Sequence, residues 1–133
     1  MKLGSSTLVL LAGTLLLAAC GGDGGGGGPG TGTQDGGEYR AVLQSPNGVE
    51  GAAAFELTGP GIQTVTQSVG RLFTQSNGTT TRIVVVQEPA GPISFKVTMA
   101  AGNGPPSARV VEVVDGNDLP RTSLSGYSVV FGR

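Results

Sequence analysis

The sequence of 133 residues contains no histidine, no tryptophan and a single cysteine, Cys20. The missing histidine excludes a Ser-His-Asp triad and every metal site that uses an imidazole ligand. The single cysteine excludes an internal disulfide and a cysteine-rich zinc site. Carboxylates are therefore the main catalytic groups that remain, and few kinds of active site can be built from them.

Charged residues are also scarce. They make up 13% of the chain, and the formal net charge is −1. The lysines and arginines are scattered singly along the sequence, so no basic segment provides the electrostatic attraction on which nucleic-acid binding depends. We therefore expect no nucleic-acid partner.

The longest apolar run lies at the amino terminus. Met1-Lys2 supplies a small positive segment, and residues 3–17 are apolar except for small or hydroxyl-bearing residues. This pattern predicts a secretory signal peptide. The run is shorter than the roughly 20 residues that a membrane-spanning helix needs, which argues against an uncleaved membrane anchor.

The end of this run, Leu17-Ala18-Ala19-Cys20, resembles the lipobox of bacterial lipoproteins. In that family a small residue precedes the cleavage point, and the cysteine after it is joined through sulfur to diacylglycerol. The resemblance implies that residues 1–19 are removed and that Cys20 becomes the lipidated first residue of an exported protein. The two or three acyl chains of such an anchor hold it stably in a membrane. Gly21 replaces the aspartate that commonly retains lipoproteins in the inner membrane, so the resemblance favours the outer membrane if the organism has one.

Glycine dominates the segment that follows, so that residues 20–37 combine the lipidated cysteine with a glycine-rich linker. After Cys20 this segment has no apolar residue to bury, and we expect it to be disordered. It is not expected to be a phosphate-binding loop, because no strand precedes it and no helix or lysine follows it. Residues 38–133 remain as one small domain.

Apolar and polar residues alternate in this domain with the period-2 spacing of half-buried strands. The clearest example is 93–99, in which Phe95 shares its parity with the other apolar residues. Other strand patterns occupy residues 39–43, 53–57, 71–74, 83–86, 109–114 and 127–131.

Turn-forming residues separate these strands at 45–48, 77–78, 102–106 and 115–118. We therefore expect successive strands to be antiparallel neighbours. Short strands at this spacing predict an all-β fold with almost no helix, an antiparallel β-sandwich of about seven to nine strands.

Residues 51–57, 78–86 and 92–97 resemble, in their order and pattern, the cohesin-like sandwiches of bacterial surface proteins. The resemblance implies a cohesin-like or immunoglobulin-like sandwich. It implies no particular activity, because one such fold supports many functions.

Asp115-Gly116-Asn117-Asp118 places three oxygen-bearing side chains in four residues. Oxygen ligands on a flexible loop suit Ca²⁺, so Asp115, Asn117 and Asp118 are a weak calcium candidate. The same residue types favour a hairpin turn, and no downstream glutamate completes a calcium loop. We favour the turn, and we predict neither a bound metal nor a cofactor.

The carboxylate candidates for catalysis are Glu50, Glu56, Glu88 and Glu112. A paired-carboxylate hydrolase needs two of them across a cleft, for which a domain of this size has little room. Glu56 alternates with apolar neighbours and is expected in solvent. Glu112 lies among valines. A glutamate in such a stretch is explained equally well by partial burial, by a place on an edge strand or by an ion pair with an arginine. We predict that the protein is not an enzyme.

Aromatic residues are few, at 5% of the chain. Strand parity directs Phe55, Phe95 and Phe131 toward the core and leaves Tyr39 and Phe73 as candidates for exposure. Sugar-binding sandwiches stack exposed rings on pyranose faces, so we do not expect a glycan-binding platform.

These exclusions favour a membrane-anchored envelope lipoprotein that presents a small β-sandwich as a binding or adhesion module for a protein partner. We expect it to be monomeric. The first alternative is a structural or envelope-assembly subunit that acts through an edge strand. The more distant alternative is a small carboxylate-dependent hydrolase.

Overall fold

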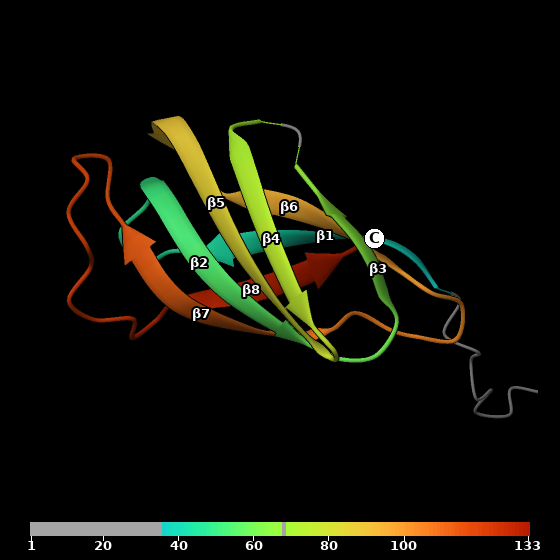
Figure 1. Ribbon diagram of the computed structural model, residues 1–133. Coiled ribbons are helices and arrows are strands. Elements are labelled where there is room, and N and C mark those ends of the chain that lie inside the picture. The colour runs from blue at the N-terminus through green and yellow to red at the C-terminus, as the bar shows by residue number, and fades with distance from the viewer. Residues whose placement is uncertain (1–35, 68) are drawn as a thin grey trace, which may run out of the picture. The chain divides into compact units, whose positions relative to one another are not determined.

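Eight β-strands and no helix make up the part of the chain that the computed structural model describes, residues 36–67 and 69–133 (Figure 1). Each strand predicted from the sequence is confirmed. The strands are β1 (Gly37–Gln44), β2 (Glu50–Thr58), β3 (Ile62–Thr66), β4 (Arg71–Asn77), β5 (Thr80–Gly91), β6 (Ser94–Met99), β7 (Ser107–Val114) and β8 (Ser128–Gly132).

The strands form two four-stranded antiparallel sheets. Sheet A has the order β3-β6-β1-β8 and sheet B the order β4-β5-β2-β7. In each sheet an early strand pairs with a late one, so that β1 lies beside β8, β2 beside β7 and β3 beside β6. The two sheets pack face to face, and the predicted antiparallel β-sandwich is confirmed.

The expected pairing of successive strands is wrong for most of the chain. Only β4 and β5 form a hairpin, in which Asn77 pairs with Thr80 across the two-residue loop Gly78-Thr79. Every other connection between consecutive strands crosses from one sheet to the other. Turn-forming residues mark where the chain changes direction. They do not show which sheet it enters next.

Strand β3 was not predicted because a bulge interrupts its pattern. The pairing of β3 with β6 slips between Ile62 and Thr64, and an extra residue of this kind breaks the period-2 alternation. Ile62 and Val65 therefore both pack against the core although they are three positions apart.

The core lies between the sheets and is built from the inward-facing residues of β1, β2, β5, β6 and β7. The rings of Phe55 and Phe95, from opposite sheets, meet at a centroid distance of 5.1 Å with an interplanar angle of 52°. The inward direction predicted for both is confirmed. The buried apolar residues are Tyr39, Ala41, Leu43, Ala53, Phe55, Leu57, Ile83, Val85, Ile93, Phe95, Val97, Met99 and Val113.

The sandwich has two sides at which an edge strand of sheet A faces an edge strand of sheet B, and the two sides differ. On one side β7 and β8 pack together and are joined by the long connection 115–127. On the other side β3 and β4 border a hollow of about 290 Å³. We call these the β7/β8 side and the β3/β4 side.

The predicted signal peptide, Cys20 and nearly all of the glycine-rich linker lie outside the described residues. Strand β1 begins at Gly37, one position before the predicted start of the domain. In the described ranges, no helix has the length and apolar character needed to cross a membrane.

Candidate functional site

A buried carboxylate, Glu50, lies at the start of β2 and is only 1% exposed. Ser45 Oγ and Tyr127 Oη donate to its Oε1 at 2.7 and 2.6 Å. Arg121 donates to Oε2 through Nε at 3.1 Å and approaches it through Nη2 at 3.0 Å. Both carboxylate oxygens are therefore satisfied, as a buried charge requires.

Burial acts to raise the pKa of Glu50, but the hydrogen bonds from Tyr127, Ser45 and Arg121, with the positive charge of Arg121, outweigh it. The pKa lies below its usual value near 4.5. The carboxylate is thus charged at neutral pH, fully bonded and closed to solvent. A substrate could not reach it without breaking these contacts, so Glu50 is placed to hold structure together.

The network around Glu50 extends in two directions. Asn47 Nδ2 donates to Tyr127 Oη at 2.7 Å, and Asp115 Oδ2 lies 3.9 Å from Arg121 Nη1. The hydrogen bond to Glu50 raises the pKa of Arg121. This Glu50 cluster joins the β1–β2 connection to the long β7–β8 connection, and it comprises Ser45, Asn47, Glu50, Asp115, Arg121 and Tyr127.

The calcium candidate belongs to the same region. Asp115 Oδ1 accepts the backbone N–H groups of Leu119 at 3.0 Å and Asn117 at 2.8 Å, and these two bonds lower the pKa of Asp115. Its other oxygen faces Arg121, and Asp118 adopts a positive φ of 63°. This is the geometry of a turn, and the calcium hypothesis gains no support from it. The described residues hold no group of three or more acidic, histidine or cysteine side chains placed to bind a metal.

The other candidate carboxylates lie apart from the Glu50 cluster. Glu56, on the outer face of sheet B, is 3.0 Å from Arg109 and 3.5 Å from Arg82. Glu88 and Glu112 are exposed, on strands that β2 separates. Glu112 is therefore an exposed residue on the edge strand β7, and an edge strand is one of the explanations predicted for it. The arrangement gives no support to a paired-carboxylate hydrolase.

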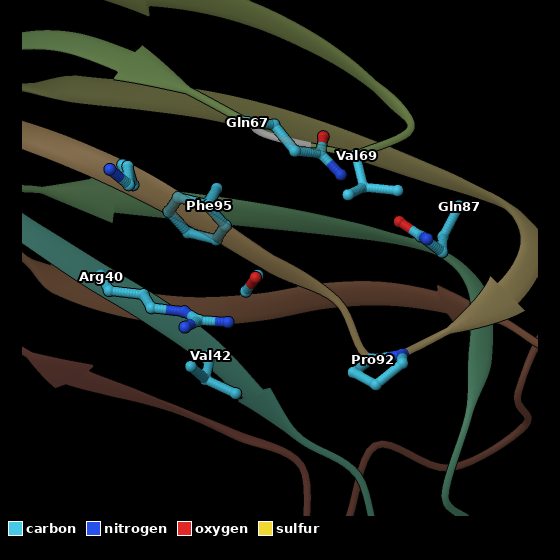
Figure 2. Close-up of a pocket in the computed structure, with 9 residues that line it drawn as sticks. Arg40, Val42, Gln67, Val69, Gln87, Pro92 and Phe95 are labelled. Carbon is cyan, nitrogen blue, oxygen red and sulfur yellow. The ribbon is translucent and has the colours of Figure 1, made fainter.

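A hollow of about 390 Å³ opens where β3 ends, and Figure 2 shows the side chains around it. Strand β3 stops at Thr66, opposite Lys96, so it leaves Ser94 and Phe95 of β6 without a neighbour on that side. We call this cavity the β6 hollow. Its lining residues are Arg40, Val42, Gln67, Val69, Gln87, Pro92, Ser94, Phe95 and Lys96.

The β6 hollow combines apolar walls with a positive charge. Arg40 and Val42 lie on one side of it and Gln67 and Val69 on the other (Figure 2). Among the described residues Arg40 has no ion pair, whereas Lys96 is bound to Glu38 at 2.7 Å. The Oε1 atom of Gln67 is buried without a hydrogen-bond partner in the described part of the chain. A buried acceptor of this kind is uncommon in folded proteins and calls for a donor.

Sequence reasoning did not predict the β6 hollow. Its residues come from β1, the β3–β4 connection, the irregular end of β5 and the start of β6. They share no motif and no spacing in the sequence. Only the pairing of β6 with β1 and the early end of β3 bring them together.

The two aromatic candidates for a binding surface differ in exposure. Tyr39 is 6% exposed, so the structure buries one of the two aromatic residues that the sequence left as candidates for exposure. The Arg133 guanidinium lies 5.2 Å from the centre of its ring and donates to its hydroxyl at 2.9 Å. Phe73 is 58% exposed. Phe131 and Tyr127 pack partly against the core, so in the described part of the chain Phe73 has the one largely exposed aromatic ring.

Comparisons with protein-family models, with characterised proteins and with solved structures found no match to this chain. The resemblances to the lipobox and to cohesin-like sandwiches therefore depend on the sequence patterns alone.

Proposed function

We propose that this protein is an exported lipoprotein, anchored through Cys20 to the cell envelope, that presents its β-sandwich as a binding module for a protein partner. The anchor is supported by the tetrapeptide Leu17-Ala18-Ala19-Cys20, and the outer membrane is the favoured location if the organism has one. The binding part is supported by the β6 hollow. We do not propose that the protein is an enzyme.

The chemistry of the β6 hollow indicates what a partner must offer. Val42, Val69 and Pro92 provide apolar surface for one apolar side chain. Arg40 would bind a carboxylate with charge-assisted hydrogen bonds. On binding, the side chain of Gln67 would turn its buried, unpartnered Oε1 toward an N–H group, such as that of a peptide backbone. The segment that fits is therefore a short stretch of protein with an apolar residue next to an aspartate or glutamate.

Site-specific photocrosslinking tests this binding site. A photoreactive amino acid at Val69, which is exposed and lines the hollow, is introduced into the full chain in its native cells. We expect one prominent protein adduct, reduced at least fivefold by Arg40→Glu because that change repels an acidic segment. Arg82→Glu, an exposed arginine on the outer face of sheet B, is the matched control and should leave the adduct unchanged. An adduct that Arg40→Glu does not reduce would contradict the proposed site.

The anchor is tested separately by growth with a labelled fatty acid. We expect the label on the wild-type chain and none on Cys20→Ala, because the sequence has no other thiol. Label that persists on Cys20→Ala would overturn the lipoprotein assignment. It would leave the β6 hollow as a binding site.

A further inference from the structure

Strand β4 is an edge of sheet B and is regular along its whole length. Its residues pair with β5 without a register slip, from Arg71 opposite Val86 to Asn77 opposite Thr80. Residues that flank a two-residue hairpin loop bond to each other, and alternate residues do so thereafter. Leu72, Thr74 and Ser76 therefore direct their backbone N–H and C=O groups away from β5.

The other edges are interrupted or covered. Strand β3 is short and bulged. The pairing of β7 slips between Ala54 and Phe55, and the chain at 119–121 lies along its end, where Arg121 N donates to Val113 O at 2.8 Å. Strand β8 packs beside β7. Proteins protect their edge strands in these ways to prevent pairing with other chains.

None of these protections is present on β4 in the described part of the chain. It contains no proline and no bulge, and its one charged residue, Arg71, is at its start. In its middle stands Phe73, 58% exposed on the outer face of sheet B beside the exposed Val84. An uncovered regular edge with an exposed aromatic residue is suited to pairing with another strand.

We propose that two copies of this protein associate through β4, antiparallel, with Thr74 opposite Thr74 of the second copy. In this register every residue with free backbone groups meets another, because Leu72 lies opposite Ser76 of the second copy. The three pairs supply roughly six backbone hydrogen bonds, two from each pair. Sheet B then continues from one copy into the next.

The side chains of β4 favour a second copy of this chain as the partner that pairs with its free edge. Arg71 lies opposite Asn77, so self-pairing opposes no like charges. Phe73 lies opposite Gln75 and diagonally from the Phe73 of the second copy, within reach of an aromatic contact. The arrangement is self-complementary, as a twofold interface requires. If the protein is anchored as proposed, confinement to one membrane also raises the effective concentration of copies. This inference replaces the monomer expected from the sequence.

Disulfide trapping tests the register. In the full chain, within membranes of the producing cells, Thr74→Cys places two thiols across the twofold axis. The Cα separation of a hydrogen-bonded antiparallel pair is about 5.5 Å, which a disulfide spans. Copper phenanthroline oxidises the two thiols to a disulfide. It accepts the two electrons of this reaction, and the two thiol protons are released to solvent. We expect at least five times more covalent dimer from Thr74→Cys than from Ser128→Cys, the matched control on edge strand β8.

A second substitution separates specific pairing from collision. Phe73→Lys, added to Thr74→Cys, puts two positive charges near the axis and should reduce the dimer at least fivefold. Val130→Lys, at a valine that is 52% exposed on β8, should not reduce it. Equal yields from Thr74→Cys and Ser128→Cys, no dimer at all, or indifference to Phe73→Lys would overturn the proposal.

The wild-type chain keeps this test independent of the proposed anchor. A wild-type dimer would show that Cys20 carries a free thiol and would contradict lipidation. The comparison of Thr74→Cys with Ser128→Cys is then made in a Cys20→Ser background, where it still supports or overturns the pairing of β4.

Discussion

The β7/β8 side and the β3/β4 side close the same sandwich by different means. On the β7/β8 side the edge strands pack together and the long connection 115–127 joins them (Figure 1). The ion pair between Arg121 and the buried Glu50 binds this connection to the start of β2. On the β3/β4 side a short connection, residues 67–70, links the edges. A side-chain hydrogen bond of 2.9 Å on this side joins Ser76 of β4 to the buried Thr81 of β5, within sheet B. The β7/β8 side is therefore held by a buried polar network, whereas the β3/β4 side has an uncovered strand edge and two hollows.

This difference separates the region that the Glu50 cluster stabilises from the region that we propose for recognition. A long connection has many conformations to lose on folding, and the Glu50 cluster supplies the fixed contacts that hold it. The β3/β4 side has the β6 hollow at the end of β3 and the uncovered edge of β4. Both proposed binding surfaces thus lie where the sandwich is least covered, and substitutions on the two sides should have different consequences.

The largest effect is expected in the core that both sides share. Phe95→Ala removes a buried ring that packs on Phe55 and should lower the free energy of unfolding by about 3–5 kcal/mol. Urea denaturation of the chain from residue 21 onward, followed by circular dichroism, measures it. A loss below about 1 kcal/mol, typical of surface sites, would show that Phe95 is not part of the core.

The next effect compares the ion pair of the buried Glu50 with an ion pair on the outer face of sheet B. Arg121→Ala leaves the carboxylate of Glu50 buried without its cation, and Arg121 itself is 28% exposed. We therefore expect Arg121→Ala to lower the free energy of unfolding by about 3 kcal/mol, near the lower end of the range for buried ion pairs. Arg109→Ala, which breaks the ion pair with Glu56 on the outer face of sheet B, is the control and should change stability by less than about 1 kcal/mol. Similar losses in both variants would contradict a special role for the Glu50 cluster.

Acid should weaken the β7/β8 side specifically. The folded-state pKa of Glu50 is lowered, as is that of Asp115, so their contribution is present above the unfolded-state pKa and is lost as pH falls through the folded-state value. Urea midpoints of the wild type should therefore fall from neutral pH to about pH 3. Glu50→Gln should start lower at neutral pH and fall less on acidification. An equally steep fall in Glu50→Gln would assign the acid sensitivity to other carboxylates.

Seven of the eight described strands were predictable because a short stretch of each shows alternation or, at 83–86, a run of β-branched residues. The Glu50 cluster was not predictable in this way. Arg121 and Tyr127 are separated from Glu50 by 71 and 77 positions, and a lone glutamate before an alanine-rich strand indicates neither burial nor a partner. The contact between Arg133 and the ring of Tyr39 was not predictable either, because 94 positions separate the two residues. Contacts of this kind depend on which strands cross between the sheets, and the turn residues do not encode that choice.

The smallest effect compares the same substitution on the two sides. Ser45→Ala removes a donor to the buried charge of Glu50, and hydrogen bonds to charged groups contribute about 1.5–3 kcal/mol. Ser76→Ala removes the bond to Thr81, but the neighbouring hollow of about 290 Å³ is large enough for water to replace the lost hydroxyl. We therefore expect about 1.5 kcal/mol for Ser45→Ala and about 0.5 kcal/mol for Ser76→Ala from these ranges. Both are read from urea midpoints at neutral pH. The two variants are comparable because each loses one hydroxyl from a side chain of equal size. Equal losses in the free energy of unfolding would show that polar contacts stabilise the two sides to a similar extent, and the sides would then differ in shape alone.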